Sequence, residues 1–162
     1  MLAQRLFAPL TALITLAAAA PARAVDPDPL VRQALDDRGL VYEVTELGHY
    51  RLKFDLADGR SQFAFVQSNT RSSGDFQTRE IWAPVFSSDQ PLSAEAANRL
   101  LHENNVCKVG AWQIYIADGK YNVAFVAKLF VDANAEGIHD VLLAVVDIAD
   151  AGEKDIFGTN SF

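Results

Sequence analysis

The sequence predicts one α+β domain, in which an antiparallel sheet of five to six strands carries three helices in the order α-β-β-β(-β)-α-β-β-α. The sheet is predicted from Asp58-Gly59 and Asp118-Gly119, because each pair stands between segments of alternating apolar and polar residues, as in a β-hairpin. The helices are predicted from apolar residues that recur at helical spacing in three separate segments.

The first helix and the strands after it follow from capping residues and alternation. Pro29 suits the first turn of a helix, Asp28 is its cap, and Gly39 ends it. A strand over 41–46 comes next. A hairpin then pairs strands expected in the 50–56 and 62–67 segments, and the second of these places Phe63 and Phe65 on one side.

The middle of the chain contains a loop, a strand and a helix. Residues 69–75 are polar and predict a loop. Residues 76–87 predict a strand that is either at the edge of the sheet or bent, because Pro84 has no backbone donor. Ser93 is a plausible cap for the second helix, and Asn104-Asn105 can close it because Asn tolerates the left-handed conformation.

A second hairpin and a third helix complete the predicted domain. Strands expected at 112–116 and 121–131 flank the Asp118-Gly119 turn, and an apolar stripe over 138–149 predicts a helix that Gly152 ends. Residues 158–162 are expected to form a flexible tail.

The two hairpins resemble each other in sequence. Residues 56–66 align without gaps on residues 116–126, and both segments contain Ala-Asp-Gly at the turn and Ala-Phe-Val at the end. A duplicated helix–hairpin unit would produce this match, and so would shared turn chemistry combined with apolar alternation.

The first 24 residues have the features of a cleavable signal peptide. Arg5 supplies the positive start, residues 6–20 are almost wholly apolar, and small residues precede a predicted cut between Ala24 and Val25. A membrane anchor is the alternative, but the apolar run is shorter than the roughly 20 residues that cross a bilayer. We therefore expect a periplasmic protein whose α+β domain covers 25–157.

The net charge and the cysteine count limit the kinds of partner that this protein is expected to bind. The chain has a net charge of −7, and cleavage would remove Arg5 and Arg23 and make it more negative. Such a surface repels nucleic acid and anionic lipid head groups, so neither nucleic acid nor, after cleavage, membrane is an expected partner. Cys107 is the only cysteine, which leaves it either buried or available for a bond to another chain.

No cluster of reactive side chains is evident. The three histidines, His49, His102 and His139, lack the spacing that would place two imidazoles on one helical face. The sequence contains no G-x-S-x-G elbow, no Gly-rich phosphate loop after a strand and no calcium loop. We predict a protein that is not an enzyme, with no catalytic residue, cofactor or metal.

The aromatic residues on the predicted strands say more about function than the reactive side chains do. Several predicted strands are apolar on both faces, as Val66 beside Phe65 and Val126 beside Phe125 illustrate, so the face without helices needs a second cover. That cover could be the loop before Phe76, a second copy of the chain or a client protein. The candidate protein-binding residues are Trp82, Phe86, Trp112 and Tyr115, with core packing as the alternative for each.

Six segments of the chain together carry a family resemblance. They are the opening helix to Gly39, Tyr50-Arg-Leu-Lys-Phe54 with its hairpin, Leu100-Leu-His-Glu-Asn-Asn105, Val109-Gly-Ala-Trp112, the second hairpin with Val123-Ala-Phe125, and the final helix into Ala149-Asp150 and Glu153. Through these segments the chain resembles the YbjN family of bacterial sensory transduction regulators over most of residues 30–157, which identifies the predicted 25–157 domain as YbjN-like. The resemblance implies a fold similar to that of type III secretion chaperones, which are small acidic proteins, often dimeric, that bind other proteins without catalysis. It implies no catalytic residues.

The leading hypothesis from the sequence is an exported, non-catalytic protein-binding domain, regulatory or chaperone-like, whose partner is another protein or a second copy in a homodimer. The alternative is a periplasmic module that binds a small molecule or lipid in an aromatic pocket under the 69–75 loop.

Overall fold

The structure is a computed structural model that describes residues 26–162. The predicted signal peptide, with its cut between Ala24 and Val25, lies outside the described residues and stays a prediction. Among the helices of the described part, none is both long enough and apolar enough to span a bilayer.

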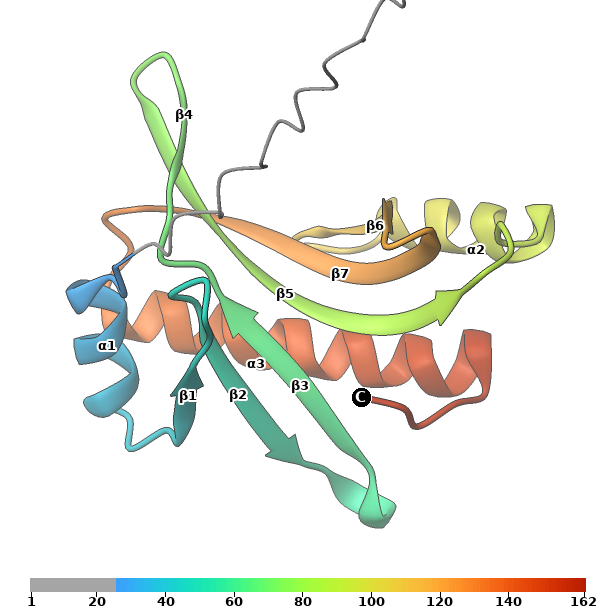
Figure 1. Cartoon of the computed structure of the whole chain (residues 1–162), viewed down its shortest axis with the longest axis horizontal. Coiled ribbons are helices and arrows are strands. Elements are labelled where there is room, and N and C mark those ends of the chain that lie inside the picture. The colour runs from blue at the N-terminus through green and yellow to red at the C-terminus, as the bar shows by residue number, and fades with distance from the viewer. Residues whose placement is uncertain (1–25) are drawn as a thin grey trace, which may run out of the picture.

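An antiparallel sheet forms the centre of the molecule (Figure 1). Its strands follow the order β1-β2-β3-β5-β7-β6, and the short strand β4 pairs with the first residues of β5. The strands are β1 (Tyr42–Val44), β2 (Tyr50–Asp55), β3 (Ser61–Val66), β4 (Arg71–Ser73), β5 (Phe76–Ser88), β6 (Ala111–Ala117) and β7 (Lys120–Phe130). The α+β class and the antiparallel sheet are thus confirmed, with β4 as a strand that the sequence did not predict.

In the described part of the chain three helices flank the sheet, as predicted, and each begins at a capping side chain. They are α1 (Pro29–Asp36), α2 (Ala94–Asn104) and α3 (Ala135–Gly152). Asp28, Ser93 and Asn134 cap them by accepting hydrogen bonds from backbone N–H groups in the first turns. A short 3₁₀ turn (Ala57–Gly59) joins β2 to β3, and a π-helical turn (Glu153–Phe157) follows α3.

The core lies between α3 and one face of the sheet, which we call the inner face. Inward residues from β2, β3, β5 and β7 pack there against Leu142, Val145 and Ala149 of α3. Figure 1 shows α3 running along the sheet with α1 beside its first turns. The Asp28 carboxylate ties α1 to the sheet through a 2.7 Å ion pair with Arg79, whose side chain is only 2% exposed.

Strand β5 is central, so the prediction that Pro84 marks an edge strand is wrong and the prediction of a bent strand is correct. The register of β5 on β7 shifts between Pro84 and Phe86, which is the mark of a β-bulge. On its other side β5 pairs with β3 through only two residue pairs before the strands diverge. The buried Gln62 side chain bridges the gap by donating to the Pro84 carbonyl at 2.7 Å.

The segment expected as a loop over 69–75 includes β4 and forms a hairpin with the start of β5. This hairpin projects away from the body of the protein (Figure 1), and residues 69–77 are all exposed. It therefore does not provide the second cover that a sheet with apolar residues on both faces needs.

The two similar hairpins differ in turn geometry. Strands β6 and β7 pair up to Ala117 and Lys120, which leaves two residues in the turn, whereas β2 and β3 pair up to Asp55 and Ser61, which leaves five. Because successive side chains of a strand alternate between the two faces, changing the number of turn residues from even to odd moves each side chain of the return strand to the opposite face. Phe65 accordingly lies on the outer face while its sequence equivalent Phe125 is in the core.

The C-terminal segment 158–162 makes specific contacts, unlike the loosely held tail that its polar composition predicts. The fully buried Glu153 carboxylate accepts hydrogen bonds from the Thr159 hydroxyl and the Ser161 amide. Arg60, at the end of the β2–β3 turn, donates to the Thr159 carbonyl at 2.9 Å and pairs with Asp150 at 2.5 Å. The polar residues thus reach partners that are distant in sequence.

Candidate binding face

The face of the sheet opposite the core, called the outer face, carries an apolar surface that none of α1, α2 or α3 covers. Its residues alternate with those of the inner face along β3, β5, β7 and β6, and none of them belongs to the core cluster under α3. The apolar members are Phe63, Phe65, Trp82, Pro84, Ala124, Val126 and Tyr115.

The centre of this face is an aromatic stack. The rings of Phe65 and Trp82 lie parallel, with centroids 4.2 Å apart, on neighbouring strands. Beside them, Ala124 and Val126 of β7 are buried although no helix covers them. Neighbouring aromatic side chains therefore shield the middle of the outer face, while Tyr115 at one side remains 41% exposed.

Two adjoining hollows mark the same face. One, of about 340 Å³, is lined by apolar and polar residues of β5, β7 and β6, by Gln67 just after β3 and by Arg71 of β4. The other, also about 340 Å³, is lined by the remaining outer-face aromatics and by Phe162 of the C-terminal segment. Trp82 and Tyr115 line both, so the two hollows form one strip across the sheet.

The four predicted binding residues occupy different environments. Trp82 and Tyr115 lie on the outer face and border both hollows. Trp112 lies in the core, 6% exposed, with its ring edge-on to Phe125 and its indole N–H donating to Glu103. Phe86 is partly buried and stacks on Phe157 at 4.4 Å, so it touches only the margin of the strip.

Sequence reasoning did not select Phe63, Phe65 and Phe162 as site residues. The alternation of β3 places the first two on one side, but it does not tell which side the helices cover. The odd number of turn residues between β2 and β3 is the feature that turns them outward. Phe162 reaches the strip because the buried Glu153 fixes the preceding residues.

Charged residues border the strip and are mostly paired. The Arg51 guanidinium lies 5.1 Å from the centre of the Phe63 ring and 2.6 Å from the Glu43 carboxylate. Glu80 pairs with Lys128 at 3.7 Å. Partial burial raises the pKa of Tyr115, so its phenol stays neutral at physiological pH.

The titratable side chains of the described part do not converge. Among residues 26–162 no group of three or more His, Cys, Asp or Glu side chains could hold a metal ion. His49 Nδ1 accepts from the Ser68 amide, and the Ser68 hydroxyl donates to the Gly48 carbonyl rather than to the imidazole. Burial raises the pKa of the Cys107 thiol, and the nearby Glu103 adds to this, which disfavours the reactive thiolate.

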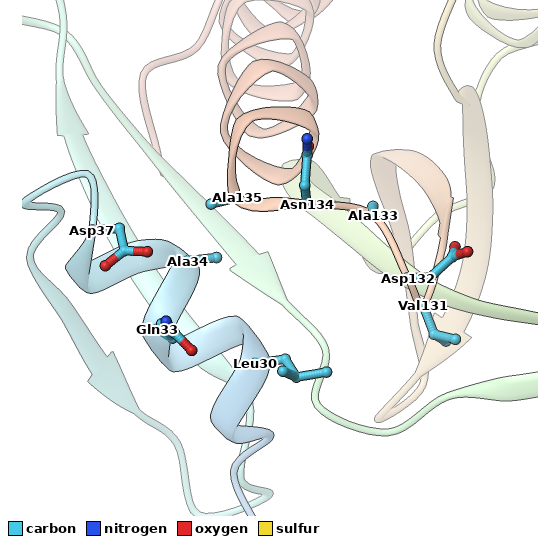
Figure 2. A pocket seen from close by; sticks show the side chains of 9 residues that line it. All are labelled: Leu30, Gln33, Ala34, Asp37, Val131, Asp132, Ala133, Asn134 and Ala135. Atoms are coloured by element: carbon cyan, nitrogen blue, oxygen red, sulfur yellow. The ribbon is translucent and has the colours of Figure 1, made fainter.

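A separate cleft of about 330 Å³ lies between α1 and the start of α3. Figure 2 shows that its two carboxylates, those of Asp37 and Asp132, stand on opposite sides and do not point toward each other. Asn134, which also lines the cleft, uses its side-chain oxygen to cap α3. The cleft therefore presents no converging polar groups.

Comparison with known proteins finds no family model that matches the chain and no curated protein that resembles it.

Proposed function

We propose that this chain is an exported, non-catalytic protein-binding domain of YbjN type, and that it binds its partner on the outer face. The observation that carries the proposal is the aromatic strip from Phe63 to Tyr115, which no helix of the described part covers. Aromatic side chains dominate the energetics of protein interfaces because they bury a large apolar area at a small entropic cost.

The shape and borders of the strip favour a polypeptide as the partner. It crosses four strands, and its two hollows are joined rather than enclosed separately. An apolar segment of another protein could place side chains in both hollows while its polar groups meet Arg51, Gln67 and Gln113 at the borders. The apolar centre with a polar rim is the common anatomy of such interfaces.

The proposal is tested by capture from periplasmic extract with matched variants. Phe63→Ala removes one aromatic residue from the strip, whereas Leu143→Ala shortens a 37% exposed residue on α3, away from the outer face. We expect a partner that is depleted at least about tenfold by the first change, since loss of an interface anchor costs about 2 kcal/mol. If every captured protein responds equally to both changes, the proposal is wrong.

A small-molecule or lipid-binding module is the second candidate, and one observation favours it. Arg71 of the 69–75 segment and the aromatic residues Trp82 and Tyr115 line one hollow together, whose volume lies at the lower end of ligand pockets. The Trp82 indole N–H is buried without a hydrogen-bond partner in the described part. Native mass spectrometry of freshly purified protein would detect a bound ligand, and a single mass equal to the bare chain would exclude this candidate.

A further inference from the structure

Strand β6 is an open edge of the sheet. Among residues 26–162 it pairs only with β7, whereas the opposite edge is the three-residue strand β1, which carries Glu43. β6 has seven residues, Ala-Trp-Gln-Ile-Tyr-Ile-Ala, with neither a charge nor a proline. Proteins usually protect an edge of this length with charges or prolines, because free backbone groups invite pairing with another strand.

The β6–β7 turn determines which backbone groups of β6 point outward. Ala117 and Lys120 flank a two-residue turn and pair with each other, so Ala117, Tyr115 and Gln113 direct their N–H and C=O groups toward β7. The alternate residues Trp112, Ile114 and Ile116 direct theirs away from the sheet.

Asn104 at the end of α2 supports this assignment and limits the free edge. Its side chain accepts from the Trp112 N–H at 2.6 Å and donates to the Trp112 carbonyl at 3.5 Å. In the described part no hydrogen bond of this kind reaches Ile114 or Ile116. The free edge therefore consists of the backbone groups of these two residues, between the Asn104 cap and the turn.

The side chains around this free edge are apolar and exposed. Ile114 is 47% and Ile116 67% exposed on the side of the inner face, and Tyr115 is 41% exposed on the outer face. Leu101 of α2, which lines a small hollow with Ile114, is 66% exposed. An apolar cluster next to unpaired backbone groups needs a strand that satisfies both.

We infer that a second copy of this chain pairs with β6, strand against strand in antiparallel orientation, about a twofold axis at Tyr115. In this register Ile114 of each copy lies opposite Ile116 of the other, and each pair exchanges two backbone hydrogen bonds. The four bonds use all the free groups, and the Asn104 cap stays intact. Two apolar pairs form on the inner side, and the two Tyr115 side chains meet at the axis.

Charge explains why the occupant is a copy of the same chain. The chain has a net charge of −7, so two copies repel each other over most of their surfaces. β6 is uncharged, and in the proposed register its nearest acid, Asp118, lies opposite the capped Trp112 and beyond the ladder. The same edge would offer a charged strand no counter-charge.

The small size of the contact sets its strength. Four backbone bonds and a few apolar side chains bury less than the roughly 800 Å² per partner of a standard stable interface. We expect a dimer that dissociates on dilution, with a dissociation constant of about 1–100 µM. The pairing does not depend on the proposed function, although it would join the two outer faces into one continuous sheet.

Cysteine crosslinking tests the register. In a Cys107→Ser background, Tyr115→Cys places two thiols directly across the axis, within the Cα separation that a disulfide allows. Gln113→Cys is the matched control. In this register position 113 lies opposite position 117 of the other copy, so the two introduced thiols are four residues apart along the strand. Mixing Gln113→Cys with Ala117→Cys, which leaves Tyr115 intact, brings those two positions opposite each other.

By sedimentation analysis we expect a dimer at a protein concentration of about 100 µM. We also expect disulfide-linked dimers of Tyr115→Cys, and of the mixture of Gln113→Cys with Ala117→Cys. Both should form at least about tenfold faster than the disulfide-linked dimer of Gln113→Cys alone. A chain that is monomeric at about 100 µM overturns the inference, as does equal crosslinking of all single variants. Binding of a client at the outer face is measured separately, so neither result decides the other.

Discussion

Gly110 offers a stringent test of how β6 is seated on the sheet. Its φ of +78° is in the left-handed region, and a Cβ at this position would overlap the carbonyl oxygen of Val126 on β7. Replacing it with Ala adds about 1–2 kcal/mol of backbone strain. The clash adds about 1–3 kcal/mol, because β7 is held by strands on both sides and cannot yield easily.

Gly119→Ala is the matched control. Gly119 has nearly the same φ, +74°, but nothing lies within 4 Å of an added Cβ, so only the backbone strain applies. Urea denaturation followed by far-UV circular dichroism should give Gly110→Ala a free energy of unfolding that is lower than that of Gly119→Ala by about 1–3 kcal/mol. Equal losses in the two variants would refute the proposed contact between Gly110 and Val126.

Three further predictions concern the core, the acid response and the C-terminal segment. Trp112→Ala should lower the free energy of unfolding, measured in urea, by about 3–5 kcal/mol, whereas Tyr115→Ala should lower it by less than about 1 kcal/mol. Similar losses of unfolding free energy in the two variants would mean that both side chains lie in the core. Burial alone would raise the pKa of Asp28, but its hydrogen bonds and ion pair with Arg79 lower it overall. The Asp28 contribution to stability is therefore complete above the unfolded pKa of about 3.9 and is lost as pH falls through the lower folded pKa. When the free energy of unfolding is measured at a series of pH values, Asp28→Asn should make it fall less steeply at the acid end. An unchanged slope of the free energy of unfolding against pH would contradict this. Glu153→Ala should speed amide hydrogen exchange across 159–161, and unchanged exchange there would show that other contacts hold the segment.

Most elements of the fold could be predicted because their signals are local. Asp28 and Ser93 cap helices as expected, and the two Asp-Gly turns lie between paired strands. Alternation also predicted correctly that the sheet is apolar on both faces. It could not tell which aromatic residues face the helices, since that depends on the order of strands and on the number of residues in each turn.

The candidate site was therefore predicted only in outline. Trp82 and Tyr115 lie on the outer face, but Trp112, on the same strand as Tyr115, points to the other side and packs in the core. The bulge after Pro84 changes the side on which Phe86 lies, and a proline signals a bend without fixing its direction. The position of Phe162 depends on Glu153, a buried carboxylate whose partners local sequence does not reveal.

Site-specific photocrosslinking in living cells tests the central claim most directly. A photoreactive residue at Phe63 reports on the outer face, and one at Leu143 reports on α3. If the aromatic strip is a binding surface, light should couple a discrete foreign protein to position 63 and not to position 143. Adducts that are absent from position 63, or that form equally at both positions, would contradict the claim.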